Sequence, residues 1–274
     1  MVREAAGTAG AVDDAVITGA ADDAVIAGAA RRGTPAGEIA TDAPAFDDES
    51  SSRPPLKRLD ALAREVRAAA RPGVRYLLGV AGSPGSGKTT LATVLVGRLN
   101  QLAPRTAAYL PMDGFHLANA TLDRLGLRDR KGALETFDGW GFLALLDRVR
   151  AETGHTVYAP SFRRAVDEGV AGELAIEPAA GVVVVEGNYL LAESGPWAQV
   201  RERLDTAWFC STPAAEREAR LVDRHVRHGR SLEAATAWAR EVDGVNAALV
   251  EATAGRADLV LSGVTAEPLT APLD

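Results

Sequence analysis

The sequence predicts an α/β domain in three layers, with helices on both faces of a mainly parallel, doubly wound sheet. Segments typical of strands and helices alternate along the chain from residue 54 onward. Four successive valines at 182–185 are typical of a strand buried on both faces, as parallel strands are. A short apolar segment at 75–81 is followed by a glycine-rich loop and then by apolar residues at helical spacing. In a sheet of this kind the ligand lies beyond the carboxyl ends of the strands.

Each expected element rests on its own pattern. Residues 57–70 carry apolar side chains at intervals of three and four, which predicts an amphipathic helix. Apolar runs predict strands over 75–81, 106–112, 181–187, 204–210 and 258–261, with shorter strands near 156–162 and 173–177. The segments between them predict helices over 88–100, 116–125, 140–151, 213–228 and 231–253.

The first 53 of the 274 residues differ in composition from the rest. They are rich in Ala, Gly, Asp and Thr, and their ten acidic and four basic residues account for six of the seven net negative charges. We therefore expect a disordered, acidic, low-complexity tail over 1–53, a folded domain over 54–265 and a C-terminal tail over 266–274. The N-terminal tail lacks the basic start and continuous apolar core of a signal peptide.

The composition limits the classes of function. The 47% of hydrophobic residues allow an ordinary buried core, and no apolar stretch is long enough to cross a membrane. The folded part is nearly neutral and has no basic run, so neither nucleic acid nor a membrane is an expected partner. The single cysteine, Cys210, excludes an intrachain disulfide, and we expect a buried thiol in a cytoplasmic protein.

Residues 82–89 read Gly-Ser-Pro-Gly-Ser-Gly-Lys-Thr, a complete G-x-x-x-x-G-K-[ST] loop between an expected strand and an expected helix. Such a loop surrounds phosphate oxygens with backbone N–H groups, and the positive end of the following helix faces the anion. Lys88 is expected to reach the β- and γ-phosphates, and Thr89 to offer a hydroxyl to Mg²⁺. The expected nucleotide-binding residues of this segment are Gly82, Ser83, Pro84, Gly85, Ser86, Gly87, Lys88, Thr89 and Thr90. The motif predicts a P-loop NTPase fold.

Two carboxylates follow strands that should end near this loop. Asp113 comes after strand 106–112, where it could accept the proton of an attacking hydroxyl; the alternative is that it caps the next helix. Glu186 ends the valine strand at the position of a Mg²⁺ ligand, and the alternative is a carboxylate that faces solvent. His116 could bind substrate or assist Asp113, or it could cap its own helix.

Other polar side chains have a less specific meaning. Three histidines lack metal-ligand spacing and are expected to be exposed: His155, His225 and His228. Four arginines of the expected helix 213–228 share one face: Arg217, Arg220, Arg224 and Arg227. This face is either solvated or, beside a nucleotide site, part of a lid that closes over phosphates.

Several motifs together resemble one family. They read PMDGFH at 111–116, RKGALETFD at 130–138, EGNYLL at 186–191 and RLVDRH at 220–225. This set is similar to the superfamily of uridine kinase, phosphoribulokinase and pantothenate kinase, and within it to the nucleoside/nucleotide kinase branch that includes kinases linked to fructose transport. The resemblance implies an ATP- and Mg²⁺-dependent kinase that phosphorylates a hydroxyl of a nucleoside, a sugar or a pantothenate-like metabolite. It also allows a homodimer.

The resemblance assigns roles to single residues. It makes Asp113 the base, places Lys88 and Thr89 at the phosphates and the metal, and places Arg220 and Arg224 in the lid. The expected acceptor-binding residues are His116, Glu135, Phe137, Asp138, Tyr158, Arg164 and Asn188. Asn246, which ends a late D-x-x-N, is expected near the adenine.

One position departs from the family pattern. Where the branch commonly has Phe-Asp-Arg, this chain has Phe162, Arg163 and Arg164, so arginine replaces a carboxylate. If that carboxylate recognises a sugar hydroxyl, the change favours an anionic acceptor. A nucleotide-driven switch with little turnover is the alternative function, although neither the N-K-x-D of GTPases nor the L-S-G-G-Q of ABC ATPases occurs in the chain.

Overall fold

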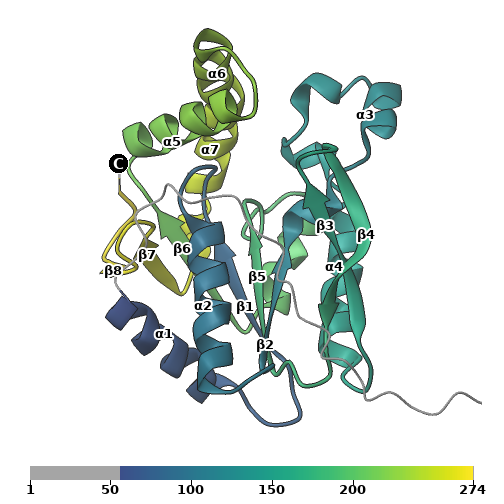
Figure 1. Cartoon of the computed structure of the whole chain (residues 1–274), viewed down its shortest axis with the longest axis vertical. Coiled ribbons are helices and arrows are strands. Elements are labelled where there is room, and N and C mark those ends of the chain that lie inside the picture. Colours follow the sequence, from purple (N-terminus) through teal and green to yellow (C-terminus); the bar gives the residue numbers. More distant parts are fainter. Residues whose placement is uncertain (1–55, 274) are drawn as a thin grey trace, which may run out of the picture. The chain divides into compact units, whose positions relative to one another are not determined.

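The computed structural model describes residues 56–273, and the predicted tail 1–53 lies outside the described residues. The main sheet has six strands in the order β2-β5-β1-β6-β7-β8 (Figure 1). The strands are β1 (Tyr76–Ala81), β2 (Ala107–Pro111), β5 (Val182–Gly187), β6 (Thr206–Ser211), β7 (Leu259–Ser262) and β8 (Pro268–Leu269). All neighbouring pairs are parallel except β7 with β8. This order places β1, which leads into the phosphate loop, between β5 and β6.

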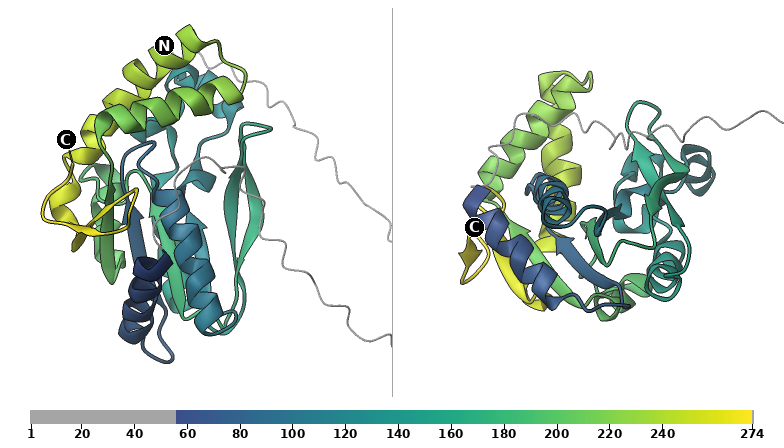
Figure 2. Two further views of the ribbon diagram at one scale, coloured as in Figure 1. Left: turned by 60° about the vertical axis from the view of Figure 1, so that its left-hand side comes forward. Right: turned by 60° about the horizontal axis from the view of Figure 1, so that its bottom comes forward.

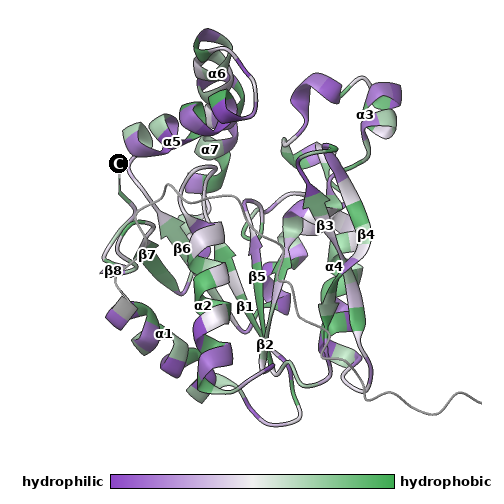
Figure 3. Ribbon diagram, in the orientation of Figure 1, coloured by the Kyte–Doolittle hydropathy of each residue, from purple (hydrophilic) through white to green (hydrophobic). Residues whose placement is uncertain are grey.

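Helices cover both faces of this sheet, as the sequence predicts (Figures 1 and 2). One face is covered by α1 (Leu56–Ala69) and α2 (Lys88–Leu102), and the other by α4 (Gly139–Ala151) and α7 (Gly244–Glu251). Because successive strand residues point to opposite faces, Val182 and Val184 belong to the first core while Val183 and Val185 belong to the second. Figure 3 shows the consequence: the central strands are mainly hydrophobic, whereas α1 carries residues of both kinds.

A separate antiparallel hairpin of β3 (Val157–Arg163) and β4 (Glu168–Ile176) lies outside the main sheet. The sequence pattern predicts only the second half of β4, because its first half contains Gly169 and Gly172, and glycine is a weak strand former. The turn between the strands ends at Asp167, a non-glycine residue with φ 54°. The hairpin tip therefore adopts a conformation that surrounding contacts must stabilise.

The segment after β2 differs from the predicted helix 116–125. A 3-10 turn (Met112–Phe115) follows β2 directly, and the α-helix, α3 (Asn119–Leu125), begins only afterwards. A Cβ atom on Gly114 would lie 2.3 Å from the carbonyl oxygen of Pro160 in β3. This close approach of two backbones fixes the turn and leaves His116 outside any helix.

The predicted helices after β6 are present with one irregularity. Helix α5 (Ala214–Arg227) precedes a helical run that consists of α6 (Leu232–Trp238), a π-helical turn (Ala239–Asp243) and α7. We call α5, α6 and α7 the lid helices; Figure 1 shows them at the end of the sheet where the parallel strands finish.

The expected C-terminal tail 266–274 differs from the structure, since β8 pairs there with β7. Among the helices of residues 56–273, none combines the length and apolarity that a bilayer crossing requires.

Arg75, immediately before β1, ties the two sides of the second core together. Its side chain is buried, with 2% of the residue exposed. The guanidinium donates hydrogen bonds to four backbone carbonyls at the end of α4 and before β5: Val149 (2.8 Å), Glu152 (3.0 Å), Glu177 (3.1 Å) and Ala180 (3.3 Å). Burial lowers the pKa of Arg75, and the charge of Glu152 opposes that shift.

We predict that Arg75→Met lowers the free energy of unfolding by about 3 kcal/mol, because it leaves buried carbonyls without donors. Urea unfolding followed by circular dichroism measures the change. Arg148→Met is the control, since Arg148 is exposed on α4 and pairs only with Glu152 among the described ion pairs. Equal unfolding midpoints for the two variants would contradict the prediction.

Candidate active site

The phosphate loop runs from the end of β1 into α2, and Thr89 and Thr90 lie in the first turn of that helix. Gly87 has φ 91°, and a Cβ atom there would lie 2.6 Å from the carbonyl oxygen of Gly263. No side chain caps the start of α2, so its first N–H groups are available to an anion. Ser86 is fully buried, and its hydroxyl has no hydrogen-bond partner among the described residues. A glycine-walled cradle with an unpaired buried hydroxyl fits the phosphates of a nucleotide.

Glu186 lies beside this loop and is almost fully buried, with 4% of the residue exposed. Its Oε1 lies 3.6 Å from Nζ of Lys88, its Oε2 accepts a hydrogen bond of 2.7 Å from the hydroxyl of Tyr109, and the Thr89 hydroxyl lies close enough to lower its pKa. Burial raises the pKa of Glu186, and Asp113 adds to the rise while Lys88 opposes it. The burial excludes a carboxylate that faces solvent. A carboxylate next to a threonine hydroxyl is a donor set that fits Mg²⁺.

Asp113 lies in the 3-10 turn after β2 and is half-buried. No hydrogen bond or ion pair joins its carboxylate to another residue of the described range 56–273. Its charge contributes to the raised pKa values of Glu186 and Tyr109, which shows that the three groups lie within electrostatic range of one another. The alternative of a helix cap is not supported, because Ala118 occupies the N-cap position of α3.

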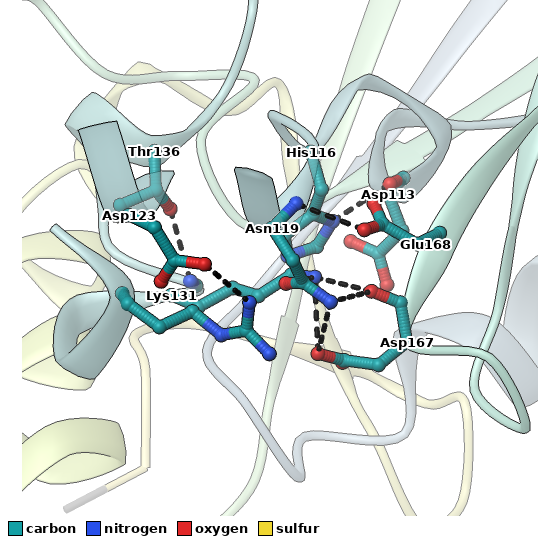
Figure 4. Close-up of polar contacts among 10 residues, drawn as sticks. Asp113, His116, Asn119, Asp123, Lys131, Thr136, Asp167 and Glu168 are labelled. Atoms are coloured by element: carbon teal, nitrogen blue, oxygen red, sulfur yellow. Dashed lines mark hydrogen bonds and ion pairs between the residues drawn. The ribbon is translucent and has the colours of Figure 1, made fainter. Parts of the chain in front are cut away.

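His116 lies between two aromatic rings, at centroid distances of 4.0 Å from Phe137 and 4.5 Å from Phe162. Its Nδ1 is 2.7 Å from the backbone oxygen of Asp113 (Figure 4). A carbonyl can only accept, so Nδ1 carries the hydrogen, and in the neutral ring Nε2 is left as an acceptor. His116 does not cap the helix that follows it, because Ala118 is the N-cap of α3; His116 instead ends the 3-10 turn as its C-cap. Phe137 is 7% exposed and packs mainly in the second core, so its ring orients His116.

Lys131 joins the loop before α4 to the hairpin tip (Figure 4). Its side chain is 10% exposed, and Nζ donates to the side-chain oxygen of Asn119 (2.6 Å) and to both the backbone and side-chain oxygens of Asp167. Nζ also lies 5.1 Å from the ring centroid of Phe162. Asn119 itself donates to Asp167, so these contacts hold the unusual backbone of the tip. We call Lys131, Asn119 and Asp167 the hairpin clamp.

The arginine face of α5 meets the phosphate loop. Arg220 donates to the backbone oxygen of Gly85 at 3.2 Å and pairs with Glu216 one turn earlier. Arg224 follows one turn later and is half-buried, whereas Arg227 is more exposed and pairs with Asp223. The face is therefore in contact with the loop at one end and solvated at the other.

Glu251, which no motif singles out, connects the phosphate loop and Arg217 to the end of α7. The hydroxyl of Ser83 donates to Oε1 of Glu251 at 2.6 Å, from the loop to the end of α7. Arg217 is buried, donates to the backbone oxygen of Thr212 and lies 3.7 Å from the same oxygen of Glu251. The arginine spacing on α5 signals Arg217, but no pattern signals Glu251, which is distant in sequence from the loop.

Three predicted acceptor-binding residues have other roles in the structure. Asp138 caps α4 by accepting a hydrogen bond of 2.8 Å from the backbone of Gly141. Glu135 is exposed and pairs with Arg130 at 2.7 Å. Tyr158 is 61% exposed, because it points away from the buried face of β3.

Residues around the hairpin and α7 also differ from expectation. The amide of Asn246 donates to the backbone oxygen of Gly132 at 3.5 Å, within the 130–138 motif that carries several predicted acceptor-binding residues. Arg163 pairs with Glu173 across the exposed hairpin, so its charge is compensated within the hairpin. Burial raises the pKa of Tyr109, and Arg164 lies close enough for its charge to oppose part of that rise. Asn188 has a buried side-chain oxygen without a partner among the described residues, so it can accept from a ligand.

Two residues outside the loop test further expectations. Cys210 is buried, and burial raises its pKa to about 12, which confirms a structural thiol. His225 is not exposed as predicted, because its Nε2 lies 2.8 Å from Oδ2 of Asp243. The π-helical turn that ends at Asp243 brings this carboxylate against α5.

Comparisons with known proteins agree with this geometry. A Schizosaccharomyces pombe protein named "Putative uridine kinase C227.14" is 33% identical over 194 residues, 68% of this chain and 83% of that protein. A crystal structure described as a "putative fructose transport system kinase" from Silicibacter sp. TM1040 has a TM-score of 0.68 and 40% identity, and covers 74% of this chain and 98% of that one. A pantothenate kinase of Bradyrhizobium sp. is 37% identical over 122 residues, 44% of this chain and 38% of that protein. No family model matches the chain.

We predict that Lys131→Met loosens the hairpin tip, because it removes charged hydrogen bonds to Asp167. Amide exchange of residues 163–168 should accelerate about tenfold or more, as expected for a charge-assisted hydrogen bond. Hydrogen exchange with mass spectrometry measures it. Arg163→Met is the matched control, since it removes a charge from the same hairpin on its exposed side. Unchanged exchange in the Lys131 variant would disprove the clamp.

Proposed function

This chain belongs to the P-loop kinases of the uridine kinase, phosphoribulokinase and pantothenate kinase superfamily, and we propose that it transfers the γ-phosphoryl group of ATP to a hydroxyl of a small metabolite. Membership makes it a phosphotransferase that binds ATP. The observation that carries the proposed reaction is the unpaired carboxylate of Asp113, within electrostatic range of Glu186 and thus of the phosphate loop.

The donor half of the proposed site uses the phosphate loop and its neighbours. Lys88 and the N–H groups of the loop bind the phosphates, and Thr89 and Glu186 hold Mg²⁺. Mg²⁺, when bound, neutralises charge on the transferred group. Arg220 already contacts the loop through Gly85, so a small movement of its guanidinium brings it to a phosphate.

The acceptor half is built around Asp113. A hydroxyl within hydrogen-bond distance of this carboxylate is oriented for attack, and its proton passes to the carboxylate as the phosphoryl group is transferred. Three groups with free hydrogen-bonding capacity lie on this side: Nε2 of His116, the amide oxygen of Asn188 and the guanidinium of Arg164. Acceptors with several hydroxyls or an amide, such as nucleosides, sugars and pantothenate-like molecules, match these groups.

A screen of ADP release across such metabolites, with ATP and Mg²⁺, tests the function. The proposed kinase releases ADP rapidly only when one metabolite class is present, and a phosphorylated product of that metabolite forms in equal amount. Nucleotide binding without acceptor-stimulated ADP release would instead favour a nucleotide-driven switch.

For the acceptor found in this way, we predict that Asp113→Asn lowers kcat by about 10²- to 10⁴-fold, because an amide cannot accept the proton. The dissociation constant of ATP, measured by calorimetry, should stay within about twofold. Asp123→Asn is the control, since Asp123 pairs with Arg128 on the exposed surface. Full turnover of the Asp113 variant would remove this residue from the mechanism.

A second prediction concerns the lid. Arg220→Met should lower kcat by about 10²-fold or more, because it removes a positive charge from the transferred phosphoryl group. Arg240→Met, on the outside of the lid helices and paired with Glu218, should leave kcat unchanged. Steady-state kinetics give kcat for both variants. An equal loss of kcat in both would mean that the total charge of the lid helices, and not the position of Arg220, determines the rate.

A further inference from the structure

The hydroxyl of Tyr109 reaches Glu186 from a neighbouring strand. Tyr109 of β2 is in register with Val184 of β5, so it lies on the same face of the sheet as Glu186, two residues further along. The two oxygen atoms are 2.7 Å apart, and the phenol is the donor. None of the motifs that identify the phosphate loop, the base or the lid includes Tyr109.

The other groups near Glu186 have a second role in the proposed function, whereas Tyr109 has no such role there. Lys88 and Thr89 come from the phosphate loop, and the proposed function requires both of them at the phosphates and the metal. Binding of a nucleotide therefore draws both groups toward the ligand. Tyr109 belongs to the body of the sheet, so its hydroxyl stays with the carboxylate.

We propose that Tyr109 is a positioning residue that holds one carboxylate oxygen of Glu186 and leaves the other directed toward Mg²⁺. The inference rests on the proposed function, because it takes Glu186 as a metal ligand. Outer partners that orient a metal ligand typically contribute 10- to 100-fold to metal affinity.

The alternative is that Tyr109 only stabilises the sheet, and the chain offers a matched control for it. Tyr76 of β1 is also a half-buried strand tyrosine, and its hydroxyl lies 2.6 Å from the hydroxyl of Thr206. Tyr76→Phe and Tyr109→Phe each remove one hydroxyl from a hydrogen bond between strands. A purely structural role predicts the same consequences for both.

The experiment measures ATP binding by calorimetry, in Mg²⁺ and in EDTA, for the wild type and both variants. The quantity compared is the dissociation constant of ATP in EDTA divided by the dissociation constant in Mg²⁺. A large ratio means that Mg²⁺ strengthens the binding of ATP. Partial unfolding lowers the stoichiometry and leaves this ratio unchanged, so the test holds for a destabilised variant. We expect Tyr109→Phe to reduce the ratio about tenfold, with binding in EDTA unaltered and Tyr76→Phe equal to the wild type.

A double-mutant cycle shows whether the effect runs through the carboxylate. In a Glu186→Gln background, Tyr109→Phe should change the ratio by less than about twofold. A wild-type ratio in the single Tyr109 variant, or an equal loss in both tyrosine variants, would overturn the positioning role. If the wild type binds ATP equally well in Mg²⁺ and in EDTA, the metal site of the proposed function is wrong, and the inference falls with it.

Discussion

The burial of the Glu186 carboxylate is the constraint on which the arrangement of the site depends. A carboxylate removed from water is costly unless donors surround it. Its polar neighbours come from separate parts of the chain: Lys88 and Thr89 from the phosphate loop, and Tyr109 from β2. The strand order places β5 between β2 and β1, so that groups from both sides reach one carboxylate. The sheet topology and the position of the loop are thus linked through a single buried charge.

The lid helices are connected to the same loop by a second set of polar contacts. Ser83 bonds to Glu251 at the end of α7, and Arg220 of α5 bonds to the backbone of Gly85. His225 and Asp243 then join α5 to the run that ends in α7. The phosphate loop is therefore in direct polar contact with both α5 and α7. The hairpin clamp around Lys131 holds a different segment, the tip of the β3–β4 hairpin.

Sequence patterns predict the fold well where one periodicity dominates. The four valines, the phosphate loop and the helices on each face all follow from apolar spacing and glycine positions. The patterns fail where long-range contacts decide the conformation. The turn at Gly114 depends on the Pro160 backbone, and the burial of His225 depends on Asp243, neither of which is visible locally. Among the site residues, those in the loop follow from a motif, whereas Tyr109, Glu251 and Lys131 depend on register and tertiary packing.

The carboxylates near the site differ in how far other contacts of the fold already occupy them. Asp138 is used as a helix cap, Glu135 is paired with Arg130, and Glu186 is surrounded by donors. Carboxylate oxygens that are already occupied by such contacts are less available to a substrate hydroxyl. The carboxylate of Asp113 has no hydrogen bond or ion pair within residues 56–273, and it lies within electrostatic range of Glu186 beside the phosphate loop. In the proposed reaction Asp113 is therefore the carboxylate with free capacity to accept a proton from an incoming hydroxyl.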